Sequence, residues 1–254
     1  MLHVGALPGT PQNNLNIPVI CQQALLEANI YRQTGFDGFL IENMHDVPYL
    51  NSSVGPEIIA GMTVISQELK KSTNLIGGIQ ILAAANREAL AVAAVTGLDF
   101  IRVENFLFGH VADEGLMQSC AGELLRYRKL LGAENILVFT DIKKKHAAHA
   151  ITGDIDIIGL ARTADFFLSD GIVFTGKMTG EAPDPDEVAR VRKTVQLPII
   201  IGSGLTPANL SEYWDNADIF IVGSSCKEEG IWSNPVSQPK CEEFMIAVKK
   251  LRSR

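Results

Sequence analysis

The sequence lacks the patterns that mark a disulfide-stabilised, zinc-binding or membrane-spanning protein. Its four cysteines, Cys21, Cys120, Cys226 and Cys241, are far apart and form neither a CxxC pair nor a zinc-site spacing. Such usage is typical of a reducing compartment. No apolar run approaches the roughly 20 residues of a membrane helix, and no signal-peptide pattern is present. We therefore expect no membrane insertion and a cytoplasmic location, or a mitochondrial or other organellar one if a targeting extension precedes Met1 in the natural protein.

Basic residues and aromatic residues are also scarce. The 22 Lys and Arg are outnumbered by 29 Asp and Glu, which gives a formal net charge of −7, and aromatics make up 7% of the chain. No basic stripe with interleaved aromatic residues is present, so we expect no nucleic-acid partner and no binding to an anionic membrane surface. Any anion-binding site must therefore be formed by a small group of residues and not by the overall charge of the protein.

Apolar strands alternate with amphipathic helices along the whole chain. Strands are expected at Leu2–Leu7, Gly38–Glu42, Leu75–Leu82, Phe100–Glu104, Ile136–Asp141, Gly171–Phe174, Ile199–Ile201 and Ile219–Val222. Helices are expected at Pro18–Thr34, Pro56–Lys71, Arg87–Thr96, Gly122–Leu131, Pro185–Thr194 and Lys240–Lys250. A further helix is expected after the connection 143–154 and ends at about Phe167, and another begins at Thr206 and Pro207. Eight such units predict an α/β fold, a single (β/α)8 TIM barrel over residues 1–254, with an open doubly wound sheet as the alternative.

The last two strands end in small residues, and this pattern predicts a phosphate site. Small residues let backbone N–H groups approach an anion closely, and the phosphate site of many barrels lies after strands 7 and 8. The residues expected to bind phosphate are Gly202, Ser203, Gly204, Gly223 and Ser224. The first three also match the start of a dinucleotide fingerprint, but Pro207 replaces its third glycine, so we reject a Rossmann site.

Three carboxylates fall at strand ends and are the candidate catalytic residues: Glu42, Glu104 and Asp141. The ends of barrel strands converge on one face, and neighbouring carboxylates raise one another's pKa, which suits a general acid or base. Further candidates for the pocket are His3, Asn43, Gln80, Arg102, Asn105, Thr175 and Gly176. For Arg102 the favoured interpretation is structural, as the partner of Glu42 or Glu104, because buried charges are usually paired.

No metal or cofactor is required by any spacing in the chain. Three carboxylates are suitable ligands for Mg²⁺, so a hard cation stays open as a minority alternative. Lys177 follows the sixth strand, where a Schiff-base lysine would be well positioned, although an exposed loop lysine is the favoured interpretation.

Several stretches together resemble the BtpA family, named for a photosystem I biogenesis protein. They are HVGALPGTP at 3–11, DGFLIENMHDVPY at 37–49, DIKKKHA at 141–147, GKMTGEAPD at 176–184, IGSGLTPANL at 201–210 and IVGSSCKEEG at 221–230. The resemblance spans nearly the whole chain and implies a barrel similar to the ribulose-phosphate-binding group, without an established reaction. Two departures stand out: IQILAAAN at 79–86 lacks an arginine usual in the family, and Lys177 replaces a small residue.

The sequence therefore predicts a barrel that binds a small phosphorylated molecule and acts as an isomerase, epimerase or lyase. The rival hypotheses are a non-catalytic assembly or stability factor, as the family name implies, and a nucleotide or nucleoside enzyme. A homo-oligomer is compatible with the long loops after the first, second and fourth strands.

Overall fold

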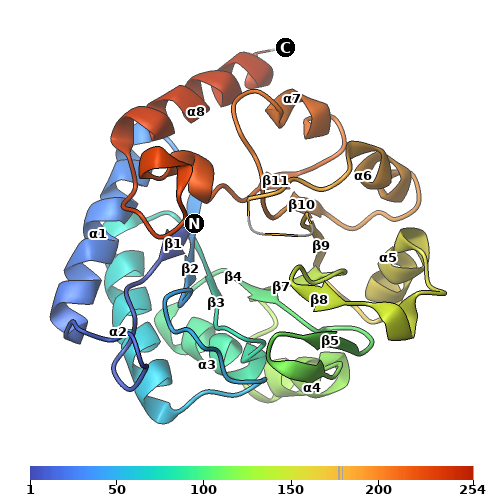
Figure 1. The fold of residues 1–254 in the computed structure, drawn as a ribbon, viewed down its shortest axis with the longest axis horizontal. Helices are drawn as coiled ribbons and strands as arrows, with labels where there is room; N and C mark the ends of the chain where they lie inside the picture. The colour runs from blue at the N-terminus through green and yellow to red at the C-terminus, as the bar shows by residue number, and fades with distance from the viewer. Residues whose placement is uncertain (177, 179, 254) are drawn as a thin grey trace.

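The computed structural model describes residues 1–176, 178 and 180–253 of the chain. Within these residues, eight parallel strands form one curved sheet in the order β1-β2-β3-β4-β7-β9-β10-β11 (Figure 1). The strands are β1 (Leu2–His3), β2 (Gly38–Glu42), β3 (Ile76–Gln80), β4 (Phe100–Val103), β7 (Leu137–Asp141), β9 (Gly171–Phe174), β10 (Ile199–Ile201) and β11 (Ile219–Phe220). The predicted α/β barrel fold is confirmed.

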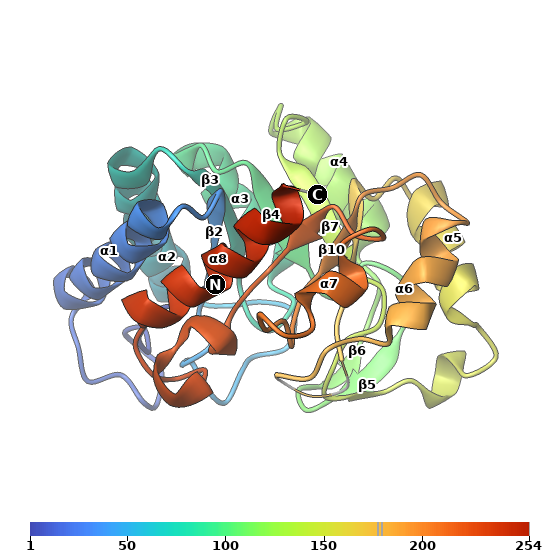
Figure 2. The ribbon, with the colours of Figure 1, turned by 90° about the horizontal axis from the view of Figure 1, so that it is seen from above.

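Helices cover the outside of the sheet (Figure 2). They are α1 (Ile17–Thr34), α2 (Pro56–Thr73), α3 (Asn86–Thr96), α4 (Ala121–Leu130), α5 (Ile157–Phe166), α6 (Pro185–Arg192), α7 (Leu210–Tyr213) and α8 (Gln238–Arg252), with short 3-10 turns at Ala150–Thr152, Ser224–Cys226 and Glu228–Gly230. Local sequence sets the ends of α1. The Asn16 side chain accepts a hydrogen bond from the Val19 N–H, Pro18 lies in the first turn, and Gly35 ends the helix with a φ of 93°.

The two faces of the sheet pack differently. Outward side chains such as Ile41 and Ile101 join the large core between sheet and helices, whereas Phe139, Val173 and Ile200 fill the barrel interior. Gly78 makes room for the interior ring of Phe100, because a Cβ atom at Gly78 would lie 2.2 Å from it. Side-chain alternation along parallel strands thus decides which residues can reach the barrel axis.

The first and last strands of the sheet meet at a seam. The terminal nitrogen of Met1 donates a hydrogen bond of 2.8 Å to the Val222 carbonyl, and the Tyr31 hydroxyl donates to the Met1 carbonyl at 2.9 Å. The seam brings the end of β11 beside the start of β1, so residues more than 200 positions apart share one wall.

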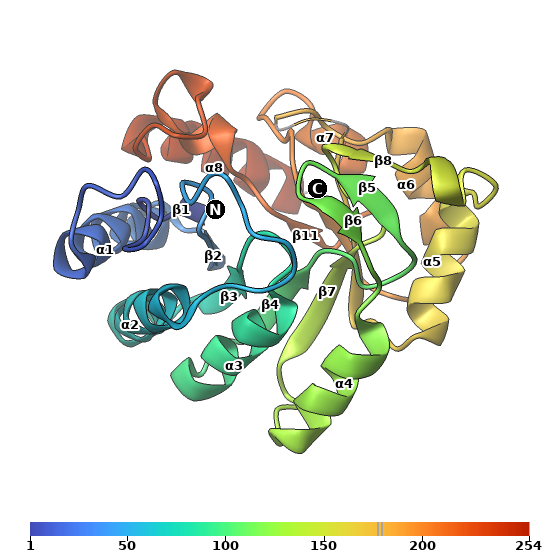
Figure 3. The same ribbon diagram turned by 60° about the horizontal axis from the view of Figure 1, so that its bottom comes forward.

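Two connections that we expected only to be long contain a second sheet. The strands β5 (His110–Ala112), β6 (Gly115–Met117) and β8 (Ala147–Ala148) pair antiparallel in the order β6-β5-β8, and Figure 3 shows β5 between β6 and β8. The Asn51 side chain donates to the Glu114 and Leu116 carbonyls at 3.1 Å and so fixes the hairpin to the loop after β2. Alternation over only two or three residues is too short for a sequence pattern to reveal.

Several expected element boundaries were wrong, and three of them show why. The first strand does not extend to Leu7, whose N–H donates to the Asp46 side chain at 2.7 Å instead of to the sheet. Helix α7 begins at Leu210 rather than at Thr206, because the Thr206 N–H donates to the Asn209 side chain at 2.8 Å and forms a turn. The last helix begins at Gln238 rather than at Lys240.

Candidate functional site

The carboxyl ends of several barrel strands surround a cavity of about 590 Å³. Eight predicted pocket residues line it: His3, Glu42, Arg102, Gly202, Ser203, Gly204, Gly223 and Ser224. Seven other predicted residues are absent from its lining: Asn43, Gln80, Glu104, Asn105, Asp141, Thr175 and Gly176. The structure therefore brings about half of the predicted residues together around one cavity and leaves the others outside its lining.

The turn after β10 approaches the neighbouring loop closely. Gly204 has a φ of +72°, and a Cβ atom there would lie 2.0 Å from the Ala182 backbone nitrogen, so only glycine fits. The Ser203 hydroxyl donates to the Glu181 carbonyl at 2.8 Å and accepts from the Gly176 N–H at 3.3 Å. The Ser203 side chain thus fixes the loop after β9, and its backbone is the part left for a ligand.

Free backbone donors collect at the ends of β10 and β11. The N–H groups of Ser203, Gly204, Ser224 and Ser225 donate to no acceptor among the described residues, and all four residues line the cavity. Gly223 has space around it, because an added Cβ atom would meet only ordinary contacts at 3.7 Å or more. Clustered N–H donors at a glycine-rich turn are suited to an anion.

On the opposite wall, Glu42 at the end of β2 faces His3 at the end of β1. Their Oε2 and Nε2 atoms are 3.4 Å apart, and the His3 Nδ1–H donates to the Trp232 carbonyl at 2.9 Å. Burial raises the pKa of Glu42, against the opposing charges of Lys145 and Arg102, and burial lowers the pKa of His3 well below its usual range. Burial thus disfavours the charged form of both groups, and a carboxyl group whose pKa is raised in this way suits proton transfer.

Arg102 on β4 pairs with Asp141 at the end of the adjacent strand β7, not with Glu42 or Glu104 as the sequence suggested. Its Nη2 is 3.0 Å from Asp141 Oδ1, its Nε is 3.2 Å from Oδ2, and both side chains are buried. The predicted partner was wrong because side-chain alternation fixes which face of the sheet Arg102 occupies, but not which carboxylate on that face it meets. Asp141 is thus paired with Arg102. Of the two residues, Arg102 lines the cavity and Asp141 does not.

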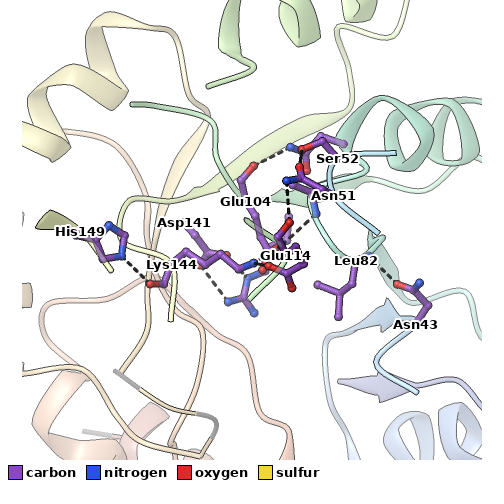
Figure 4. A network of polar contacts seen from close by, with 12 residues as sticks. Asn43, Asn51, Ser52, Leu82, Glu104, Glu114, Asp141, Lys144 and His149 are labelled. Carbon is purple, nitrogen blue, oxygen red and sulfur yellow. Dashed lines mark hydrogen bonds and ion pairs between the residues drawn. The ribbon is translucent and has the colours of Figure 1, made fainter. Parts of the chain in front are cut away.

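Glu104 belongs to a separate buried cluster beneath the β5–β6 hairpin (Figure 4). Lys144 Nζ lies 2.8 Å from Glu114 Oε2 and 3.7 Å from Glu104 Oε2, which also accepts from the Ala84 N–H at 3.1 Å. Burial raises the pKa of Glu104 to about 7, although Lys144 opposes the shift. Burial alone would lower the pKa of Lys144, but Glu104 and Glu114 outweigh it and raise that pKa. The cluster holds the hairpin, and Glu104 does not line the main cavity.

The remaining predicted pocket residues have local roles or buried side chains. The Asn43 side chain accepts from the Leu82 N–H at 2.7 Å and donates to Asp46 at 2.8 Å, and Thr175 donates to the Lys143 carbonyl at 3.3 Å. Gly176 is the donor to Ser203 already described. Both amide atoms of Asn105 and the Oε1 atom of Gln80 are buried without a hydrogen-bond partner among the described residues.

The sequence analysis missed several residues of the cavity wall, among them Lys145 and Trp232. Lys145 lies between β7 and β8, and Trp232 lies in the loop before α8. Burial, followed by the charge of Arg102, lowers the pKa of Lys145. The run of three lysines at 143–145 was a visible signal, but the sequence could not show which of them turns inward.

No group of three metal-ligating His, Cys, Asp or Glu side chains occurs in the described part of the chain. The strand-end carboxylates cannot act as one ligand set, because Asp141 is held by Arg102 and Glu104 lies in a different cluster. Among the described helices, none is both long and apolar enough to cross a bilayer.

Comparisons with other sequences extend over the whole chain. Residues 1–250 match the BtpA family. A mitochondrial protein of Caenorhabditis elegans is 48% identical, with 99% of this chain and 92% of that protein covered. The photosystem I biogenesis protein BtpA of Synechocystis is 30% identical, with 98% of this chain and 86% of that protein covered.

Solved structures with the same fold share little sequence with this chain. Orotidine 5′-phosphate decarboxylase from Pyrococcus horikoshii matches with a TM-score of 0.59 at 13% identity, covering 90% of this chain and 94% of that one. A 3-hexulose-6-phosphate synthase matches with a TM-score of 0.58 at 16% identity, covering 89% and 94%. These structures support the barrel fold, and the sequence matches, which span the chain, establish its family. The chain belongs to the BtpA family.

Proposed function

We propose that the chain is an enzyme that binds a small phosphorylated metabolite and catalyses an isomerisation, epimerisation or lyase reaction on it. One observation carries the proposal: backbone N–H groups without protein acceptors, from the ends of two adjacent strands, face a cavity of about 590 Å³ that also contains a candidate acid–base pair. This volume suits a small metabolite.

The two walls of the cavity suit two parts of such a ligand. A phosphate group would bind at the N–H donors of Gly204 and Ser224, where a concave arrangement of amides favours an anion. The rest of the molecule would lie toward Arg102 and Glu42. Glu42, with its raised pKa, would donate a proton to the reacting group or remove one, and neutral His3 would orient the Glu42 carboxyl.

The names of the structural neighbours agree with this substrate class. Orotidine 5′-phosphate and hexulose 6-phosphate are phosphorylated small molecules, and both names belong to enzymes of the same fold. The neighbours are too distant in sequence to specify a reaction. The proposal therefore stays at the level of ligand class and proton transfer.

Thermal unfolding with matched ligand pairs tests phosphate binding. Glycerol 3-phosphate and glycerol differ only in the phosphate, and a ligand at about 100 times its Kd contributes about 2.7 kcal/mol to the free energy of unfolding. We expect stabilisation by the phosphorylated member only. Gly223→Leu should remove the effect, because its side chain would project toward His3 and the cavity, whereas Gly5→Ala, which meets only ordinary contacts, should retain it. Equal shifts with both ligands would refute the phosphate site.

Glu42→Gln tests the acid–base role once a phosphorylated ligand is known. Glutamine keeps the shape of the side chain but cannot transfer a proton, so we expect ligand binding to persist and turnover to fall by about 10²–10⁴-fold. Glu68→Gln, at a partly exposed position on α2, is the matched control. Unchanged turnover in Glu42→Gln would remove Glu42 from the mechanism.

The Synechocystis relative carries the name of a photosystem I biogenesis protein, and this favours one second candidate, a non-catalytic assembly factor. A stable protein partner in a pull-down, together with a harmless Glu42→Gln substitution in cells, would support it. The name of the C. elegans relative includes the word mitochondrial, so we propose a mitochondrial location for this chain as the alternative to a cytoplasmic one. Cell fractionation separates the two.

A further inference from the structure

Three consecutive lysines lie in three different environments. Lys143 is exposed, and Lys144 is buried between Glu114 and Glu104 at 2.8 and 3.7 Å. Lys145 is half-buried and lines the main cavity together with Glu42 and Arg102. Of the three, Lys145 alone lines that cavity.

Lys145 has no local partner that would hold its proton. No carboxylate of the described residues lies within 4 Å of its Nζ, and no described acceptor takes a hydrogen bond from it. Burial lowers the pKa of Lys145, the Arg102 guanidinium lowers it further, and Glu42 and Asp141 only partly compensate. A lysine that is desolvated and close to a second cation is an activated nucleophile.

We propose that Lys145 is a catalytic nucleophile that forms an imine with an aldehyde or ketone carbonyl of the substrate. The inference rests on the proposed function, since the substrate's phosphate would anchor at the ends of β10 and β11, and it narrows the substrate class to carbonyl phosphates. Lys177, the lysine that the sequence suggested for this chemistry, lies outside the described residues.

The chemistry balances without an external oxidant or reductant. As the Lys145 amine adds to the carbonyl carbon, the protonated Glu42 carboxyl gives its proton to the carbonyl oxygen, and the resulting Glu42 carboxylate takes the surplus proton from the nitrogen, which leaves a neutral carbinolamine. Glu42 then gives that proton to the departing hydroxyl, so that one water leaves as the carbon–nitrogen double bond forms. The resulting iminium takes up the electron pair of a carbon–hydrogen or carbon–carbon bond at the adjacent carbon, and the Glu42 carboxylate accepts the proton released from that carbon or from the hydroxyl of the departing fragment. Hydrolysis of the imine consumes one water and restores the amine.

Reductive trapping with a general aldehyde phosphate tests the inference without knowledge of the natural substrate. Pyridoxal 5′-phosphate is incubated with the whole chain, sodium borohydride reduces any imine to a stable amine, and fragment mass spectrometry assigns the adduct among residues 143–145. The modified residue gains the mass of the aldehyde less one oxygen atom. We expect Lys145 to be labelled faster than Lys143, because the lowered pKa of Lys145 leaves more of its amine unprotonated. The paired Lys144 should stay unlabelled.

Two additions make each outcome decisive. Glycerol 3-phosphate, which has no carbonyl, should slow the labelling of Lys145 and leave that of Lys143 unchanged. Lys145→Met should lose the adduct while keeping its glycerol 3-phosphate binding and its melting temperature, and Lys143→Met is the matched control. If glycerol 3-phosphate binds but Lys145 is labelled no faster than Lys143, the imine inference fails and the proposed function stands. If glycerol 3-phosphate neither binds nor protects Lys145, the phosphorylated substrate class fails, and with it both proposals.

Discussion

Replacing Glu104 by glutamine should change how the stability of the protein depends on pH. Glu104 is 5% exposed and lies 3.7 Å from Lys144, and burial raises its pKa from an ordinary 4.5 to about 7. Between these two values the folded state binds a proton that the unfolded state has released. The free energy of unfolding therefore decreases as the pH rises from 4.5 to 7, and it decreases no further above 7.

The size of this decrease follows from the two pKa values. They differ by about 2.5 units at about 1.4 kcal/mol per unit, so Glu104 costs the folded protein about 3 kcal/mol at pH 8 that it does not cost at pH 4.5. Glutamine has nearly the same shape, can accept the same hydrogen bond from the Ala84 N–H, and does not titrate. The variant should lack this part of the pH dependence, whatever the substitution costs at low pH.

Urea unfolding at pH 4.5, 6 and 8 measures the effect in wild type, Glu104→Gln and the partly exposed control Glu68→Gln. The difference in free energy of unfolding between Glu104→Gln and wild type should shift in favour of the variant by about 3 kcal/mol from pH 4.5 to pH 8. Glu68→Gln should follow the wild-type profile. A constant difference between Glu104→Gln and wild type across this range would show that the buried cluster does not perturb Glu104, and would refute the reasoning.

Two further substitutions test the packing and the charges. Gly78→Ala should lower the free energy of unfolding by about 1–3 kcal/mol, because its Cβ would lie 2.2 Å from the Phe100 ring inside the barrel; Gly5→Ala is the control, and equal urea midpoints would contradict the interior packing. Lys227→Met should cost about 3–5 kcal/mol, because the Lys227 ammonium is buried 3.1 Å from Glu27 and its loss leaves that carboxylate unpaired. The same unfolding assay measures this loss, which should shrink when Glu27→Gln is added, and a double variant as unstable as Lys227→Met would exclude the pairing argument.

The strands show which parts of the fold depend on local sequence. The β2, β9 and β10 boundaries were predicted to the residue, because short apolar runs there end in glycine or polar residues. The first strand was predicted too long, because the Leu7 N–H finds its acceptor in Asp46, which is distant in sequence. Local patterns thus fix where an element exists, and long-range hydrogen bonds decide where it stops.

The candidate site likewise has features that the sequence predicts and features that only the structure shows. The sequence alone determined the α/β alternation, the glycine-rich ends of the last two strands and the position of Glu42 at a strand end, because these depend on alternation, on chain turns and on the common face of parallel strands. Only the tertiary structure decided that Asp141 pairs with Arg102, that Glu104 lies under the hairpin, and that Lys145 is the lysine facing the cavity. These facts depend on which side chains of neighbouring strands meet inside the barrel and on how the loops fold over it, and no periodicity along the chain encodes such contacts.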